Sequence, residues 1–295
     1  MRNLLSLPWL TVRLHWASSI RTATIQSGTS KNTDTLKIKN KILLVALLSV
    51  ALAVTGSAQR KNAKIDVGEA LKGYFTPVST PFARPDAKGF IRRWMILEPI
   101  SKPNSSNRVF TDSYTRENLS VEYFPNQYTV IPKDGDKVKV TMEYQPPVNL
   151  SSNRPTAPQG EQPKFVKATL TWHALDRDHF FVKLFRFATG LDKDRYGVIF
   201  WTVTVINCEE DIENVRLAVG SNKAARWWVN GEEVLLLAGD RHMGVDSAVS
   251  DRVTLKKGKN VLRGVTMNGP GMSEFCARFI DDTGKPVTNF TITCN

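Results

Sequence analysis

The feature that most restricts the fold of this sequence is a period of two in its apolar residues beyond about residue 90. β-branched and aromatic residues alternate with polar ones or form short blocks, and helical periodicity is scarce. Turn signals such as Asn230-Gly231 and Lys257-Gly258 separate the blocks. The pattern predicts an all-β protein, an antiparallel β-sandwich or jelly roll. Strands are predicted over residues 90–97, 138–142, 167–172, 180–187, 197–207, 214–219, 225–229, 233–237, 252–256, 260–267, 274–280 and 289–294.

Two segments depart from this pattern. Residues 65–71 predict a short helix that ends before Gly73. Residues 141–164 contain five prolines, which remove backbone donors and disfavour strands, so a long exposed loop is predicted there.

The N-terminal 58 residues predict export. Within residues 37–58, three lysines precede an apolar run over 42–54, and small residues follow up to Ala58. This is typical of a signal peptide cleaved before Gln59, and the run is shorter than the roughly 20 residues of a membrane span. We therefore expect a periplasmic or secreted protein with no membrane span after cleavage. Residues 1–36 are interpreted as a non-structural leader from a start site placed too far upstream, or as an amphipathic targeting leader.

Net charge argues against a nucleic-acid partner. The chain of 295 residues carries a formal charge of +12, but its first 58 residues hold seven basic residues and one acid. About half of the charge therefore lies in the segment that export would remove, so no nucleic-acid binding is predicted.

One hairpin motif is the most informative part of the sequence. The segment Ala225-Arg226-Trp227-Trp228-Val229-Asn230-Gly231 predicts a strand that enters a tight type I′ turn. A second strand follows, and then residues 251–265 and 275–284 supply a Leu-Lys-Lys-Gly-Lys-Asn strand pair and a closing strand.

These motifs resemble the galactose-binding-like accessory β-sandwiches of secreted polysaccharide-degradation proteins, as in acetylxylan esterase-related proteins. The resemblance is good over residues 197–288 and thinner over 90–190, where Glu98 in Trp94-Met-Ile-Leu-Glu-Pro99 replaces the family's glycine. We divide the mature chain into an N-terminal extension over 59–89, a β region over 90–190 and a galactose-binding-like sandwich over 191–295; the last two are either separate or one unit. The resemblance implies no catalytic residue.

Strand alternation supplies candidate ligand-binding residues at the hairpin. Trp227 and Val229 should face the core, which places Trp228 and Arg226 on the opposite face. Trp228 is a candidate platform for a sugar ring, with Arg226 and Asn230 donating hydrogen bonds to hydroxyls. The alternative is that Trp228 lies beneath a crossing loop, and Trp172 has the same two interpretations.

A loop after the hairpin is the second candidate region. Asp240, Arg241 and Asp246 are candidates for polar ligand contacts, because loops at sandwich ends commonly hold ligands. The alternative is a solvated loop with a local ion pair. The glycine-rich residues 268–272 are expected to border the same place.

Metal and thiol chemistry has little support. Asp281 and Asp282 are weak candidates for a structural calcium, with a plain Asp-rich turn as the alternative, and no cofactor is predicted. Cys208 and Cys294 end two predicted strands, so they either pair or, like Cys276, remain free thiols.

The sequence thus predicts a non-catalytic exported accessory protein that binds or packs in a polysaccharide-utilisation system. The expected partners are a polysaccharide or oligosaccharide and a glycan-degrading enzyme. No Gly-x-Ser-x-Gly elbow, phosphate-binding loop or dinucleotide pattern is present. Two alternatives stay open: a carbohydrate esterase-related hydrolase or glycosidase component, and a structural module without a ligand.

Overall fold

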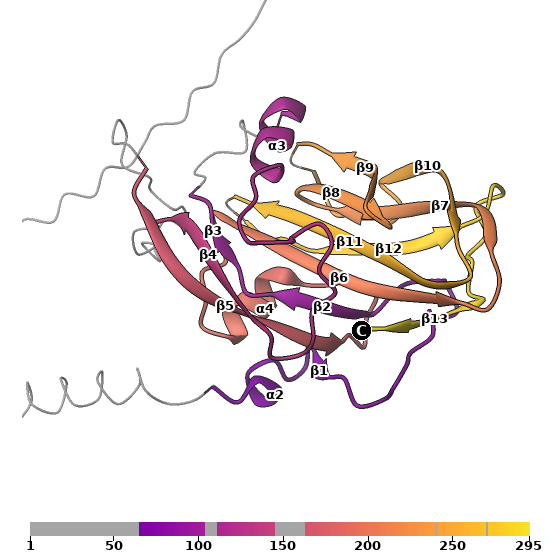
Figure 1. The fold of residues 1–295 in the computed structure, drawn as a ribbon, viewed down its shortest axis with the longest axis horizontal. Helices are drawn as coiled ribbons and strands as arrows, with labels where there is room; N and C mark the ends of the chain where they lie inside the picture. The colour runs from indigo at the N-terminus through magenta and orange to yellow at the C-terminus, as the bar shows by residue number, and fades with distance from the viewer. Residues whose placement is uncertain (1–64, 104–110, 145–162, 240, 270) are drawn as a thin grey trace, which may run out of the picture. The chain divides into compact units, whose positions relative to one another are not determined.

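Strands dominate the part of the chain that the computed structural model describes, which is residues 65–103, 111–144, 163–239, 241–269 and 271–295 (Figure 1). Every strand pairing among these residues is antiparallel. The prediction of an all-β antiparallel sandwich is therefore confirmed. Ile65–Asn295 form one compact unit, and β2 and β5 of the N-terminal half belong to the same sheet as the strands that follow.

A large and a small sheet face each other. The large sheet has the order β1-β5-β2-β6-β11-β8-β9, with β3 and β13 also paired to β6 and β4 paired to β5. The small sheet has the order β10-β7-β12. The strands are β1 (Thr76–Pro77), β2 (Arg93–Leu97), β3 (Ile100–Ser101), β4 (Lys137–Glu143), β5 (Phe165–Asp176), β6 (Val198–Cys208), β7 (Ile212–Ser221), β8 (Ala224–Val229), β9 (Glu232–Leu237), β10 (Ala248–Leu255), β11 (Gly258–Asn268), β12 (Phe275–Ile280) and β13 (Phe290–Thr293).

The predicted short helix over 65–71 is confirmed as α2 (Val67–Ala70), which begins at the N-cap Asp66. The Asp66 carboxylate accepts hydrogen bonds from the first-turn N–H groups of Gly68 and Glu69. Helix α3 (Asp112–Leu119) begins at Thr111, whose hydroxyl accepts from the Tyr114 N–H. It was not predicted from the sequence.

The strand predicted over residues 180–187 is wrong, because helix α4 (Leu184–Gly190) occupies its second half. Leu184, Phe187, Ala188 and Leu191 are all buried in the core between the sheets. Their spacing of i, i+3, i+4 and i+7 places them on one helical face. The apolar block around Phe187 therefore fits a helix that packs one face on the core better than a strand.

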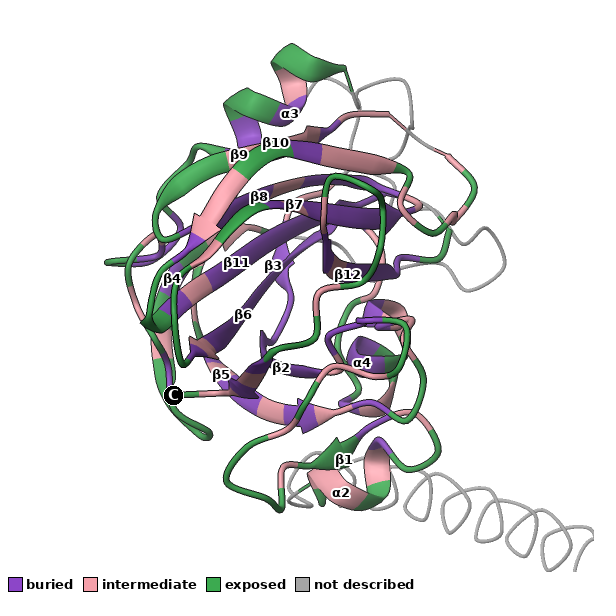
Figure 2. Ribbon diagram, turned by 90° about the vertical axis from the view of Figure 1, so that its right-hand side faces the viewer, coloured by how far each residue is buried: buried purple, intermediate pink, exposed green. Residues whose placement is uncertain are grey.

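Two apolar cores lie on opposite faces of the large sheet. The first fills the space between the two sheets and includes Trp94, Trp227 and Phe275. The second lies on the other face and includes Trp201 and Trp228 together with Leu119 of α3. Central strands are consequently buried on both faces, and ten of the eleven residues of β6 are buried (Figure 2).

The export segment lies outside the described residues. The leader over 1–36, the signal peptide over 37–58 and the start of the extension over 59–89 are therefore not tested. Most of the proline-rich segment also lies outside, although Thr141–Glu143 continue β4 rather than a loop. Within the described part of the chain, no helix is long and apolar enough to cross a membrane.

Candidate functional site

The predicted sugar platform at Trp228 is wrong, because the second core covers that side chain. Trp228 is only 5% exposed. Its indole stacks on that of Trp201 at 5.8 Å between ring centroids, and Tyr128 packs edge-on against it at 5.5 Å. The alternative, in which Trp228 lies beneath a crossing segment, is what the structure shows, and Tyr128 belongs to that segment. Trp172 is likewise fully buried and contacts Phe124 edge-on, so it offers no face to a ligand.

Arg226 and Asn230 have structural partners at the hairpin. Arg226 donates to the Ser120 hydroxyl at 2.8 Å and to the Glu233 carboxylate at 2.5 Å, and its guanidinium lies over the Trp228 ring. The Asn230 amide accepts from the Val261 N–H at 2.8 Å and donates to another side-chain amide at 2.9 Å. These contacts tie α3 and β11 to the hairpin, so neither side chain is left free to bind a sugar hydroxyl.

The loop after the hairpin forms internal contacts as well. The Asp246 carboxylate accepts from Arg278 Nε at 3.1 Å and forms an ion pair with the same guanidinium. Arg241 donates from its side chain to the Ala238 carbonyl. The alternative of a loop with a local ion pair therefore holds at Asp246, which pairs with Arg278. Asp240 lies outside the described residues.

Asn222 joins that loop to the glycine-rich segment after β11. Its carbonyl accepts from the Arg241 N–H at 3.3 Å. Its side chain donates to the Met272 carbonyl at 2.8 Å and accepts from the Glu274 N–H at 3.0 Å. The expectation that these two loops border the same place is confirmed.

The candidate calcium residues belong to a turn. Asp281 accepts from the N–H and hydroxyl of Thr283 and from the Lys285 N–H, all within 2.9 Å. Asp282 pairs with Arg252 at 2.9 Å. No group of three or more His, Cys, Asp or Glu side chains among the described residues is placed to hold a metal ion. This arrangement matches the Asp-rich turn rather than a cation site.

The three cysteines are free thiols. Cys208 lies opposite Phe290 in the β6–β13 pairing, whereas Cys294 follows Thr293 at the other end of that pairing. Cys208 belongs to the first core and Cys294 packs against the second. The pair that the strand ends suggested is therefore not formed.

An exposed polar surface lies on the ribbon formed by β4 and β5. Residues directly opposite in this pairing include Lys139 with Thr169 and Thr141 with Lys167. Opposite residues of an antiparallel pair point to the same side. We call this side the ribbon face; it consists of Lys137, Lys139, Thr141, Glu143, Phe165, Lys167, Thr169 and Thr171.

The ribbon is one-sided. On the side opposite to the ribbon face, Val140 and Leu170 are buried in the second core, and Val138, Met142 and Ala168 pack against it. The polar residues of the ribbon face are left toward solvent because this antiparallel pair is covered on one side only.

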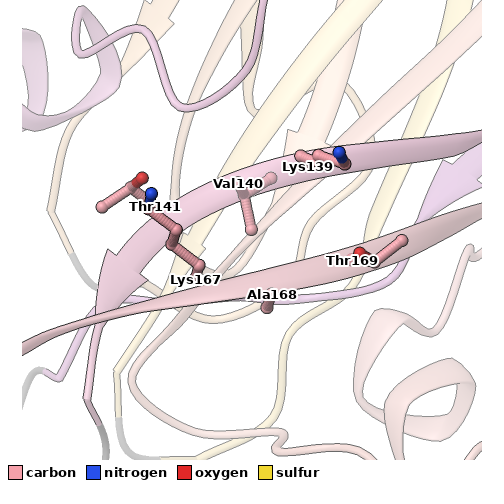
Figure 3. Close-up of a pocket in the computed structure, with 6 residues that line it drawn as sticks. All are labelled: Lys139, Val140, Thr141, Lys167, Ala168 and Thr169. Atoms are coloured by element: carbon pink, nitrogen blue, oxygen red, sulfur yellow. The ribbon is translucent and has the colours of Figure 1, made fainter.

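A shallow groove of about 450 Å³ lies on the ribbon (Figure 3). The groove is lined by two lysines and two threonines of the ribbon face and by two apolar residues of the opposite side; the six are Lys139, Thr141, Lys167, Thr169, Val140 and Ala168. Figure 3 shows the Lys167 side chain reaching from β5 toward Thr141, its register partner on β4. Neither lysine forms a hydrogen bond or ion pair with another residue of the described ranges, so both are available to a ligand.

An exposed aromatic ring lies on the ribbon face two residues from the groove residue Lys167, at Phe165. Phe165 is 63% exposed, the highest value among the large apolar residues that the structure describes. Tyr144, the residue after β4, is 49% exposed, and its N–H donates to the Lys164 carbonyl at 2.6 Å. A ring in this position offers a flat apolar surface next to hydroxyls and ammonium groups.

A buried polar cluster stands at the other end of the ribbon. Glu98 accepts from the Thr171 N–H at 3.2 Å and lies 3.4 Å from His173 Nε2 and 3.3 Å from Lys193 Nζ. Burial disfavours the charged form of Glu98, but the contacts with His173, Lys193 and the Thr171 N–H hold the pKa of its carboxyl below the usual value. Glu98 is the residue that departs from the family glycine, and it joins β2 to β5.

A second groove, of about 400 Å³, lies beside the hairpin and includes Asn230, Arg252 and Lys256. Its two basic side chains already have carboxylate partners, since Arg252 pairs with Asp282 and Lys256 with Asp211. The ribbon groove is therefore the better candidate for a ligand site.

Sequence reasoning missed the ribbon face, although the signal was present. Residues 165–171 alternate, and Phe165 falls in phase with Lys167 and Thr169 instead of with the apolar Val166 and Ala168. A phenylalanine on the polar side of a one-sided strand is a mismatch that points to an exposed ring.

Fold and groove together define an antiparallel β-sandwich that carries a one-sided polar ribbon with an aromatic end. No protein-family model matches the chain, and no curated protein matches it. Among solved structures, the PA14 sugar-binding domain from an RTX adhesin is 10% identical, with 68% of this chain and 96% of that chain covered and a TM-score of 0.33. The PA14 domain of the MpAFP antifreeze protein is 11% identical, with 72% and 92% covered and a TM-score of 0.31.

The beta-glucosidase from Kluyveromyces marxianus in complex with glucose is 15% identical, with 55% of this chain and 19% of that chain covered and a TM-score of 0.27. Because all three TM-scores lie below 0.5, these likenesses assign neither a fold family nor a ligand to this chain. The resemblance to galactose-binding-like accessory domains stays a prediction.

Proposed function

We propose that this chain is a carbohydrate-binding module that holds a glycan on the ribbon face without catalysing a reaction on it. The observation that carries the proposal is the exposed ring of Phe165 on the same face of the ribbon as the two lysines and two threonines of the groove, two residues from Lys167. A pyranose ring has an apolar face and a rim of hydroxyls, so it matches a surface that offers an aromatic ring and hydrogen-bonding groups side by side.

The shape of the surface supports an extended ligand. The ribbon face runs over four opposite residue pairs, from Glu143 and Phe165 to Lys137 and Thr171. At about 3.4 Å per residue in an antiparallel strand, these pairs extend over about 20 Å. A polysaccharide chain can lie along such a flat strip, whereas a small ligand would bind better in a deep pocket.

The cellular role is part of the same proposal. A signal peptide over 37–58, with cleavage between Ala58 and Gln59, would deliver the protein to the periplasm or beyond. There it would act as an accessory protein in polysaccharide utilisation, close to a glycan-degrading enzyme, as the resemblance to acetylxylan esterase-related accessory regions implies. Amino-terminal sequencing of the exported protein tests the cleavage site.

Binding to a glycan panel tests the function. The purified chain should be retained in affinity electrophoresis through gels that contain a soluble polysaccharide. Phe165→Ala should weaken retention about tenfold, because a ring stacked on a ligand contributes roughly 1–1.5 kcal/mol. Phe82→Ala is the matched control, since Phe82 is 51% exposed but lies outside the ribbon face. Equal retention of Phe165→Ala and wild type on every glycan would contradict the ribbon site.

The hydrolase alternative is tested by turnover. Glu98 and His173 are the buried acid and base nearest to the ribbon face, so a hydrolytic reaction at this place would depend on them. Release of acetate from acetylated xylan, abolished by Glu98→Gln in a correctly folded protein, would replace the non-catalytic proposal.

A further inference from the structure

We infer that the ligand of the ribbon face is an anionic polysaccharide whose carboxylate or sulfate groups pair with Lys137, Lys139 and Lys167. This inference rests on the proposed function and adds the chemical class of the glycan. It follows from the kinds of hydrogen-bonding groups on the ribbon face, from their charge and from their spacing.

The ribbon face offers hydrogen-bond donors that cannot accept. Ammonium groups donate hydrogen bonds and accept none, so the acceptors of the face outside its single carboxylate are the hydroxyls of its three threonines. The single carboxylate on the face, Glu143, forms an ion pair with Lys102. A neutral sugar presents hydroxyls that need acceptors as well as donors, so a ligand rich in acceptor oxygens fits this surface better.

The charge of the face is uncompensated. Lys137, Lys139 and Lys167 are exposed, and none of them pairs with a carboxylate among the described residues. Some exposed basic side chains elsewhere do pair with a carboxylate, as Lys256 does with Asp211 and Arg252 with Asp282. Three neighbouring ammonium groups without a counter-charge repel each other, and an anion bound between them removes that repulsion.

The spacing of these charges suits a linear polymer. Lys139 and Lys167 occupy diagonal positions of the β4–β5 register, so their Cβ atoms are about 7–8 Å apart. Lys137 lies two residues from Lys139 on the same side, a further separation of about 7 Å along the strand. A row of cations that ends at the exposed Phe165 ring provides charge contacts along a chain and a stacking surface for one of its sugar units.

The test compares glycans that differ in charge. The purified full chain is titrated by isothermal calorimetry with polygalacturonate, with its methyl-esterified form and with neutral xylan. Polygalacturonate should bind most tightly, and its affinity should fall as sodium chloride is raised from 50 to 500 mM, because salt screens exposed charge pairs. Esterification, which removes the carboxylate charge but keeps the sugar, should reduce the affinity at least tenfold.

Variants identify the cations. The double variant Lys139→Gln, Lys167→Gln should bind polygalacturonate roughly threefold to thirtyfold more weakly, as expected for the loss of two solvent-exposed ion pairs. The charge-preserving variant Lys139→Arg, Lys167→Arg should retain most of the affinity. The control Lys88→Gln, Lys285→Gln removes the same charge from exposed positions outside the ribbon face and should change the affinity less than threefold.

The outcomes separate this inference from the proposed function. If xylan binds as tightly as polygalacturonate and the Lys139 and Lys167 variants bind normally, while Phe165→Ala still loses binding, the inference is wrong and the carbohydrate-binding function stands. If polyglutamate binds as tightly as polygalacturonate, the face recognises charge without sugar, and the inference is wrong. If no glycan binds to the wild-type chain at any salt concentration, the proposed function fails as well.

Discussion

The indoles of Trp201 and Trp228 lie stacked at 5.8 Å between centroids, with an angle of 14° between their planes. Trp201 comes from the central strand β6 and Trp228 from β8, and the intervening strand β11 carries Val265 into the same core. The stacked pair therefore joins β6 to β8 across β11, on the face of the large sheet that α3 covers.

Replacing Trp228 by alanine should lower the free energy of unfolding by roughly 3–5 kcal/mol, because the substitution leaves a cavity beneath Tyr128 and beside Trp201. Urea unfolding followed by circular dichroism measures this loss. Phe165→Ala, which removes an exposed ring, should change the same quantity by no more than about 0.5 kcal/mol. Similar losses for the two variants would contradict the burial of Trp228.

Gly264 of β11 should not tolerate a side chain. A Cβ atom at this position would lie 2.5 Å from Cζ3 of the buried Trp227 indole. Gly264→Ala should therefore destabilise the protein by about 1–3 kcal/mol through overpacking. The same urea experiment can compare Trp227→Leu in two backgrounds. This substitution should lower the free energy of unfolding less in the Gly264→Ala protein than in the wild type, because leucine removes the clash with the new Cβ atom. A Gly264→Ala protein as stable as the wild type would show that the sheet adjusts without strain.

Glu98→Gln should change how stability depends on pH. The pKa of Glu98 is lowered in the folded protein from the ordinary value of 4.5, so its charge stabilises the fold above that value. This contribution is lost as the pH falls through the lower, folded-state pKa. The variant should therefore be less stable than the wild type by roughly 1–2 kcal/mol at pH 7, since glutamine lacks the charge beside Lys193 and has one acceptor oxygen where the carboxylate has two.

The difference between wild type and Glu98→Gln should shrink toward zero in acid. Thermal unfolding at pH 7, 5, 4 and 3 measures it. Glu210→Gln is the control, since Glu210 is exposed and its substitution should leave the pH dependence unchanged. A gap between wild type and Glu98→Gln that stays constant down to pH 3 would contradict the stabilising role of the charge.

The thiols should react slowly in the native protein. Burial raises the pKa of Cys276 to about 12 and that of Cys294 to about 12, which leaves about a thousandfold less thiolate at pH 8 than an ordinary thiol with a pKa of 9 has. Iodoacetamide at pH 8, with mass spectrometry of the products, should label three cysteines in guanidinium and leave these two largely unlabelled in the folded chain. Rapid native labelling of Cys276 would contradict its burial.

The sequence predicted most strands because their local signals agree with their environment. The alternation in residues 137–143 and 165–171 and the Asn230-Gly231 turn each identify an element without knowledge of its neighbours. Helix α4 was missed because residues 180–187 are rich in aromatic residues, which favour strands, and a short apolar block fits the period of a strand as well as that of a helix. The expectation that residues 268–272 border the loop over 240–246 rested on the close approach that glycine allows the backbone. In the structure, Asn222 contacts both Arg241 and Met272.

The candidate site was largely decided by tertiary structure. Alternation placed Trp228 opposite Trp227 correctly, but it contained no information on α3 and the segment through Tyr128, which cover that face. The side chains of Asn230, Arg226 and Asp246 were predicted to be available to a ligand. Each has a protein partner at least 30 residues away in the sequence, and no local pattern indicates these contacts. The local pattern therefore determined that this chain forms one-sided and two-sided strands in antiparallel pairs. Which face meets solvent depends on long-range packing, and that packing leaves the β4–β5 ribbon open while it closes the hairpin.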